Sequence, residues 1–101
     1  MNRWNIPAWL EREVIARDTN CVYCRVEFCT RIRKTTPSWE HIVNDAQNIT
    51  RENIVRCCVS CNASKGAKLI AAWLNSTYCK KRNITVNTVS PVVKMALDRL
   101  I

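Results

Sequence analysis

The apolar positions of this chain follow a helical spacing near both ends and a strand-like pattern in the middle. Near the N-terminus, Ile6, Trp9, Leu10 and Val14 recur every three or four residues, and Pro7 suits a first helical turn. This pattern predicts a helix over residues 7–17. Toward the C-terminus, Ser90 is a favourable N-cap before Pro91, and an amphipathic helix is predicted with apolar positions Val89, Val92, Val93, Ala96, Leu97 and Leu100.

Between these helices the chain predicts two short strands and a third helical region. Residues 37–43 and 53–57 are the two candidate strands, the second of them rich in β-branched side chains, and a polar loop joins them. Residues 18–20 form a turn, whereas residues 25–34 have no clear period and suit either a short hairpin or a loop. After Cys61 the spacing is helical, with an apolar stripe of Leu69, Ile70, Trp73 and Leu74 and with Lys65 and Lys68 on another flank.

The length and the charge of the chain narrow the class of protein. A chain of 101 residues without a break in composition is expected to form one domain, residues 1–101. Sixteen Lys and Arg against eight Asp and Glu give a net charge of +8. Such an excess favours a polyanionic partner, because each neutralised phosphate releases counterions, although a generally basic solvated surface is the alternative.

No stretch approaches the roughly 18 apolar residues of a membrane span, and the N-terminus lacks the apolar run of a secretory signal. We therefore expect no membrane association. With seven cysteines, an odd number, a complete set of disulfides within the chain is impossible. We expect a reducing, cytoplasmic location in which paired cysteines hold a metal.

Two Cys-x-x-Cys pairs predict a structural zinc site. Four thiolates, those of Cys21, Cys24, Cys58 and Cys61, suit a closed tetrahedral site with Zn–S distances of about 2.3 Å. A redox role for these pairs is less favoured, because no βαβ pattern surrounds them. Cys57 is an alternative ligand to Cys58, but only Cys58 repeats the two-residue gap. Two further cysteines, Cys29 and Cys79, are expected to pack as small apolar residues.

A second group of residues predicts chemistry at the end of the first strand. Glu40 and His41 are adjacent, so their side chains point to opposite sides of the backbone. The oxygens of Glu40 and Asn62 suit Mg²⁺ or Mn²⁺ better than zinc. Asn53 can hold the His41 ring or its backbone by hydrogen bonds. A single histidine is commonly an ordinary surface or core residue, so the catalytic interpretation of His41 depends on the residues around it.

Taken in order, these residues resemble the HNH endonucleases, also called ββα-metal nucleases. The resemblance covers about residues 14–68 and rests on Arg17-Asp18, Cys21-Val-Tyr-Cys24, Glu40-His41-Ile-Val, Asn53-Ile-Val and Cys58-Val-Ser-Cys61-Asn62-Ala-Ser-Lys65. It implies an α+β fold: a small ββα-metal core with a zinc knuckle, flanked by an N-terminal and a C-terminal helix. Asn62 takes a position that is often histidine, and Glu40 one where aspartate is more usual, so the preferred metal stays open.

The resemblance implies that the chain hydrolyses DNA phosphodiester bonds. In that scheme His41 is the general base, Asn53 orients it, and Glu40 and Asn62 hold one divalent cation that stabilises the departing 3′ oxygen. The implied products carry a 5′-phosphate and a 3′-hydroxyl. The side chains of Lys65, Arg56 and Lys68 are expected to contact backbone phosphates, with a solvated helix face as their alternative.

Several alternatives remain open at the level of sequence. A non-catalytic zinc module that binds nucleic acid or protein would need the four cysteines and the basic surface, but not the Glu40, His41, Asn53 and Asn62 set. RNA is a possible substrate as well as DNA. The C-terminal helix suits packing on the core or pairing in a homodimer, and the short chain leaves targeting to a partner protein as an option. Of the tryptophans, Trp9, Trp39 and Trp73 are expected in the core, and Trp4 suits either the core or base stacking.

Overall fold

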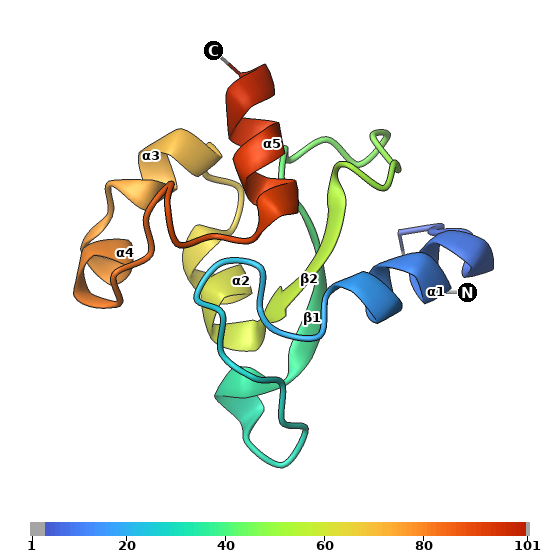
Figure 1. Cartoon of the computed structure of the whole chain (residues 1–101), viewed down its shortest axis with the longest axis horizontal. Helices are drawn as coiled ribbons and strands as arrows, with labels where there is room; N and C mark the ends of the chain where they lie inside the picture. The colour runs from blue at the N-terminus through green and yellow to red at the C-terminus, as the bar shows by residue number, and fades with distance from the viewer. Residues whose placement is uncertain (1–3, 101) are drawn as a thin grey trace.

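A computed structural model of the protein describes residues 4–100. Its elements are α1 (Ala8–Arg17), a 3₁₀ turn η1 (Arg33–Thr35), β1 (Pro37–His41), β2 (Ile54–Cys58), α2 (Val59–Lys65), α3 (Ile70–Leu74), α4 (Thr77–Lys81) and α5 (Pro91–Arg99) (Figure 1). The predicted small α+β architecture is confirmed at this level. Within residues 4–100, no helix combines the length and the apolar character that crossing a membrane requires.

The two strands form an antiparallel hairpin at the centre of the molecule (Figure 1). Their register pairs Trp39 with Arg56, Glu40 with Val55, and His41 with Ile54. Both strands begin and end within two residues of the predicted bounds. The helix α2 starts directly after β2, so the hairpin and this helix form a continuous ββα unit.

The N-terminal helix α1 packs on the hairpin through one narrow apolar face. Ile6, Leu10 and Val14 form a small core cluster with Ile54 of β2. The prediction that Trp9 belongs to the core is wrong, because its side chain lies outside this face. Trp9 is 52% exposed, and the guanidinium of Arg51 lies 5.8 Å from its ring centroid.

The main core lies on the side of the hairpin that faces α2 to α5. Its largest fully buried side chains are Trp73 and Tyr23, whose rings meet edge to face at 4.9 Å. The C-terminal helix α5 contributes Val93 and Ala96 to this core. In the part of the chain that the structure describes, the C-terminal helix therefore packs on the core.

The helical region after β2 differs from its prediction in where its helices begin and end. The helix α2 starts at Val59, before Cys61, and stops at Lys65 because Gly66 adopts φ +50°, a backbone conformation that side chains with a Cβ rarely adopt. Leu69 then precedes α3 with its side chain 79% exposed, so it is not part of the predicted apolar stripe. The stripe itself is confirmed at Ile70 and Trp73, which are buried.

Candidate functional site

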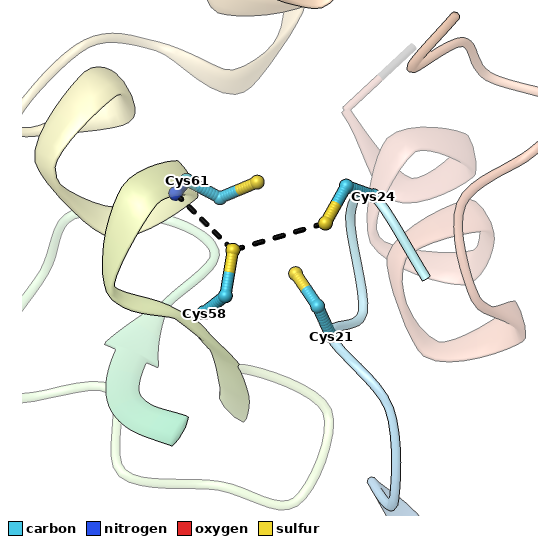
Figure 2. A group of neighbouring side chains, drawn as sticks. All are labelled: Cys21, Cys24, Cys58 and Cys61. Atoms are coloured by element: carbon cyan, nitrogen blue, oxygen red, sulfur yellow. Dashed lines mark hydrogen bonds between the residues drawn. The ribbon is translucent and has the colours of Figure 1, made fainter. Parts of the chain in front are cut away.

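The four predicted zinc ligands lie together. The thiols of Cys21 and Cys24 come from a loop after α1, whereas those of Cys58 and Cys61 come from the start of α2, and all four sulfurs point into one space (Figure 2). Their sulfur atoms lie within 4.8 Å of one another, with 3.7 Å between Cys24 and Cys58. A tetrahedron with Zn–S distances of about 2.3 Å has edges of about 3.8 Å, so the spacing suits zinc.

Local backbone hydrogen bonds shape each half of this cluster. In the first half, the Cys21 N–H donates to the Val26 carbonyl at 2.9 Å, and Arg25 adopts φ +68° to close the turn. In the second half, Cys58 is the N-cap of α2, and its sulfur accepts the Cys61 N–H at 3.4 Å. Two tight turns that are far apart in sequence therefore present two thiols each.

The protonation of the cluster explains why a cation suits it. Hydrogen bonds from Cys24, Cys58 and Cys61 lower the pKa of Cys21 far below that of a free thiol. Hydrogen bonding to the Cys21 sulfur, in turn, raises the pKa of Cys61. For Cys24, hydrogen bonding to Cys21 raises the pKa and hydrogen bonds from Cys58 and Cys61 lower it, to about 7 overall. The thiolate form is therefore favoured at Cys21 and close to neutral pH at Cys24, and a divalent metal ion would stabilise all four sulfurs in that form.

One contact of the cluster had no signal in the sequence. The hydroxyl of Tyr78 in α4 donates a hydrogen bond to the Cys61 sulfur at 3.3 Å and contacts Ser60 Oγ at 2.8 Å. The guanidinium of Arg82 covers the face of the same ring, 3.7 Å from its centroid. Tyr78 therefore links α4 to the cluster, and only the fold brings it there.

The other cysteines lie apart from the four sulfurs. Cys57, the alternative ligand, is buried in β2 with its sulfur 3.8 Å from Ser38 Oγ, and it is not a member of the cluster. Cys79 is fully buried in the main core, as expected of a small apolar side chain. Cys29 is half-buried in the loop before η1.

The Glu40 side chain enters the interior between the hairpin and α2. It is 8% exposed, and its carboxylate accepts hydrogen bonds from the Tyr23 hydroxyl at 3.3 Å and from the His41 N–H at 3.1 Å. Its Oε2 also lies 3.1 Å from the Lys65 ammonium. Burial raises the pKa of Glu40, and the charge of Lys65 opposes that rise.

Lys65 does not lie where the sequence placed it. It was expected on a helix flank in contact with phosphate, but its side chain is fully buried. Its Nζ atom lies 3.4 Å from the His41 carbonyl as well as 3.1 Å from Glu40 Oε2. The placement of Lys65 on a solvated helix flank is therefore wrong, because its ammonium lies inside against the buried Glu40 carboxylate, and its contact with phosphate stays a prediction.

His41 lies at the end of β1 in a different environment from its neighbour. The residue is 6% exposed, and its ring meets Trp4 edge to face at a centroid distance of 5.1 Å. Its Nε2 atom is buried without a hydrogen-bond partner among the described residues. Burial lowers the pKa of the imidazole, which favours the neutral ring.

Asn53 holds the backbone that follows His41 rather than the imidazole. Its side-chain oxygen accepts the Val43 N–H at 2.8 Å, and its side-chain nitrogen donates to the carbonyls of Val43 and Asn48. The carbonyl of Asn53 also accepts the Ile42 N–H at 3.0 Å. The Asn53 side chain therefore binds the backbone of Val43 and Asn48, and not the ring or the backbone of His41 that the sequence suggested.

Asn62 reaches β1 from the second turn of α2. Its side-chain nitrogen donates to Ser38 Oγ at 3.0 Å and to the Trp39 carbonyl at 3.1 Å. These contacts place the amide beside the strand that carries Glu40, with its nitrogen rather than its oxygen against the backbone.

The two remaining basic residues differ in exposure. Arg56 is half-buried, with its guanidinium 5.4 Å from the ring centroid of Phe28 and 5.7 Å from that of Trp39. Trp39 itself is half-buried beside the α1 cluster. Lys68 is exposed and donates to the Ser64 carbonyl at 2.8 Å.

The atoms around Lys65 are those that a hard cation prefers. A carboxylate oxygen of Glu40 and the carbonyl oxygen of His41 both lie within 3.4 Å of the ammonium. Oxygen donors of this kind suit Mg²⁺ or Mn²⁺. These oxygen donors thus suit a divalent ion in chemistry, and the ammonium of Lys65 is the positive charge that lies beside them in this structure.

Comparison with known proteins finds no relative: no protein-family model matches the chain, and no curated protein or solved structure matches it significantly. The fold and the site therefore define a small α+β protein with a four-cysteine cluster that could bind a metal such as zinc.

Proposed function

We propose that this protein is a metal-dependent endonuclease that hydrolyses phosphodiester bonds in DNA. The observation that carries the proposal is the state of His41. Its buried Nε2 atom has no hydrogen-bond partner among residues 4–100, and it belongs to the residue next to the buried carboxylate of Glu40. A base needs an acceptor atom that is not already used, and a neutral ring that can take up a proton.

In the proposed reaction, neutral His41 accepts a proton from water while the water oxygen forms a bond to phosphorus in line with the departing 3′ oxygen. The bond from phosphorus to that oxygen breaks, and solvent returns a proton to it. Asn53 fixes the backbone after His41 and so holds the base in position. A divalent ion bound at Glu40 and Asn62 would supply positive charge to the phosphate and the leaving oxygen.

The charge of the chain supports a nucleic-acid substrate. The net charge of +8 favours binding of a polyanion, and of the three basic residues proposed to contact phosphate, Lys68 and the half-buried Arg56 keep exposed surface. DNA is the proposed substrate, and an RNA strand, which has the same phosphodiester linkage but carries 2′-hydroxyls, is the comparison substrate for the assay.

Plasmid cleavage tests this function directly. The zinc-loaded protein is incubated with supercoiled DNA and Mg²⁺ or Mn²⁺, and nicked and linear products are separated on a gel. We expect cleavage by the wild type and a loss of about 10²-fold or more in His41→Ala, because general-base catalysis contributes about that much.

His41→Gln is the matched variant, since it keeps a polar side chain of similar size but cannot act as a base near neutral pH. Zinc content and the thermal melt of each variant establish that the fold is intact. Cleavage that is undiminished in both folded variants would exclude His41 as the base.

A non-catalytic zinc module that binds nucleic acid is the second candidate. The observation in its favour is that Tyr23, Lys65 and the His41 N–H already satisfy the Glu40 carboxylate. Such a module would bind DNA with a strong dependence on salt and leave it uncut with every divalent metal. The same plasmid assay, together with a binding measurement, separates the two functions.

A further inference from the structure

A lysine side chain rarely lies fully inside a domain of this size, yet Lys65 is 0% exposed. Its ammonium contacts Glu40 Oε2 at 3.1 Å and the His41 carbonyl at 3.4 Å. Both contacts go to the two residues on which the proposed nuclease site depends. The buried Lys65 ammonium is therefore part of the proposed site, and its position has to be explained together with the function of that site.

We propose that Lys65 is an internal competitor for the catalytic cation: its ammonium occupies the cation position beside Glu40, and a divalent ion binds there only by displacing it. This inference rests on the proposed function, because it assigns the ion to Glu40. Binding of the divalent ion at Glu40 is then an exchange, in which the ion replaces the ammonium of Lys65.

The physical reason is the burial of Glu40. A carboxylate that is 8% exposed needs a positive charge nearby, because an unpaired buried charge is strongly destabilising. Lys65 supplies that charge when no metal is bound, so the fold is stable without the ion. An ammonium and a divalent ion repel each other at this range, so the two cannot share the Glu40 oxygens.

The surroundings of Glu40 do not depend on the lysine alone. The Tyr23 hydroxyl, which also donates to Oε2, and the His41 N–H, which donates to Oε1, are neutral donors that hold the carboxylate in place. Lys65 is also the last residue of α2, next to Gly66 with its φ of +50°, so α2 does not continue past it. Displacement of the ammonium thus changes the charge partner of Glu40 while the carboxylate keeps two hydrogen bonds.

Manganese binding measures this competition without reference to cleavage. The zinc-loaded wild type, Lys65→Met and Lys68→Met are titrated with Mn²⁺, and free Mn²⁺ is measured by electron paramagnetic resonance. We expect Lys65→Met to bind Mn²⁺ about tenfold or more tightly than the wild type, because a like charge is removed from the site. Lys68→Met removes an exposed lysine three residues away and should leave the affinity unchanged.

The double variant Lys65→Met/Glu40→Gln tests whether the ion binds at Glu40. It should lose the increase in Mn²⁺ affinity that is expected for Lys65→Met. If Lys65→Met binds Mn²⁺ no more tightly than the wild type, or if the gain persists in the double variant, the inference is wrong. If Lys65→Met does not fold alone, its melting temperature in Mn²⁺ decides: folding restored by Mn²⁺ supports the inference, and no restoration overturns it.

Failure of this inference is distinguishable from failure of the proposed function. Cleavage that depends on His41, together with unchanged Mn²⁺ affinity in Lys65→Met, would reject only the competition. Tighter Mn²⁺ binding in Lys65→Met without cleavage by any variant would reject the nuclease and leave the exchange of cations at Glu40 in place.

Discussion

The Tyr78 hydroxyl contacts the cysteine cluster from outside its four thiols. Its O–H donates to the Cys61 sulfur at 3.3 Å, and Cys61 is one of two thiols, with Cys58, whose pKa is raised by hydrogen bonding to Cys21. A hydrogen bond to sulfur stabilises the thiolate form that binds metal, so this contact should favour occupation of the site.

Replacing Tyr78 with Phe should weaken zinc binding by about tenfold or more, as is typical when a hydrogen bond to a metal ligand is removed. The affinity is measured by competition with a chromophoric zinc chelator. Arg82→Ala is the control, because Arg82 covers the ring without a contact to the sulfur. Equal affinities for Tyr78→Phe and the wild type would show that the hydroxyl does not tune the site.

At the scale of elements, α1 and β2 are joined by a hydrogen-bonded charge pair at the C-terminal end of the helix. The Arg17 guanidinium contacts the Asp18 carboxylate at 2.7 Å and donates to the Ile54 carbonyl at 2.9 Å. The same carboxylate accepts the Arg56 N–H at 3.1 Å. One buried acid thus fixes the end of α1 against the strand that pairs with the Glu40–His41 end of β1.

We expect Asp18→Asn to lower the free energy of unfolding by about 1–3 kcal/mol, because it removes a charged acceptor from buried hydrogen bonds. Urea denaturation of the zinc-loaded protein provides the measurement. Asp98→Asn, on an exposed part of α5, makes the same chemical change and should cost little. Similar unfolding energies for the two variants would contradict the role of Asp18.

The predictions for individual elements were accurate where they rested on residues that are neighbours in the sequence. The two strands and α5 were recognised because strand composition and Pro91 act on neighbouring residues, and these elements lie close to their predicted bounds. Ser90 precedes α5 as predicted, but its side chain makes no capping hydrogen bond, and its Oγ atom is buried without a partner among the described residues. The exposure of Trp9 and Leu69 could not be predicted from spacing. A helical period states which residues share a face, but the packing of neighbouring elements decides how wide the buried part of that face is.

At the scale of the whole molecule, the cysteine cluster joins a loop after α1 to the start of α2, segments more than 30 residues apart. A metal held there would close most of the ββα unit into one loop. In a chain of 101 residues with a modest core, its binding energy would be part of the folding energy.

Cys58→Ser should therefore lose bound zinc and melt at a lower temperature. If the free energy of unfolding falls by about 3 kcal/mol, the melting temperature of a domain of this size falls by roughly 12–24 °C. Zinc is measured by metal analysis and melting by circular dichroism. Cys57→Ser is the matched control, since that thiol lies next in sequence but outside the cluster. Retention of zinc by Cys58→Ser would refute the four-sulfur site.

The sequence by itself determined the two strands and the two Cys-x-x-Cys pairs, because strand composition and the two-residue gap act over short distances along the chain. The α+β class was what the family resemblance implied, and the meeting of the two cysteine pairs depends on the fold. The sequence also singled out Glu40, His41, Asn53 and Asn62 as candidates. Only the tertiary structure decided their partners: Lys65 and Tyr23 on Glu40, Tyr78 on Cys61, and backbone on Asn53. Burial creates those partnerships, since a polar group removed from water takes the nearest complementary group in space, whatever its position in the chain.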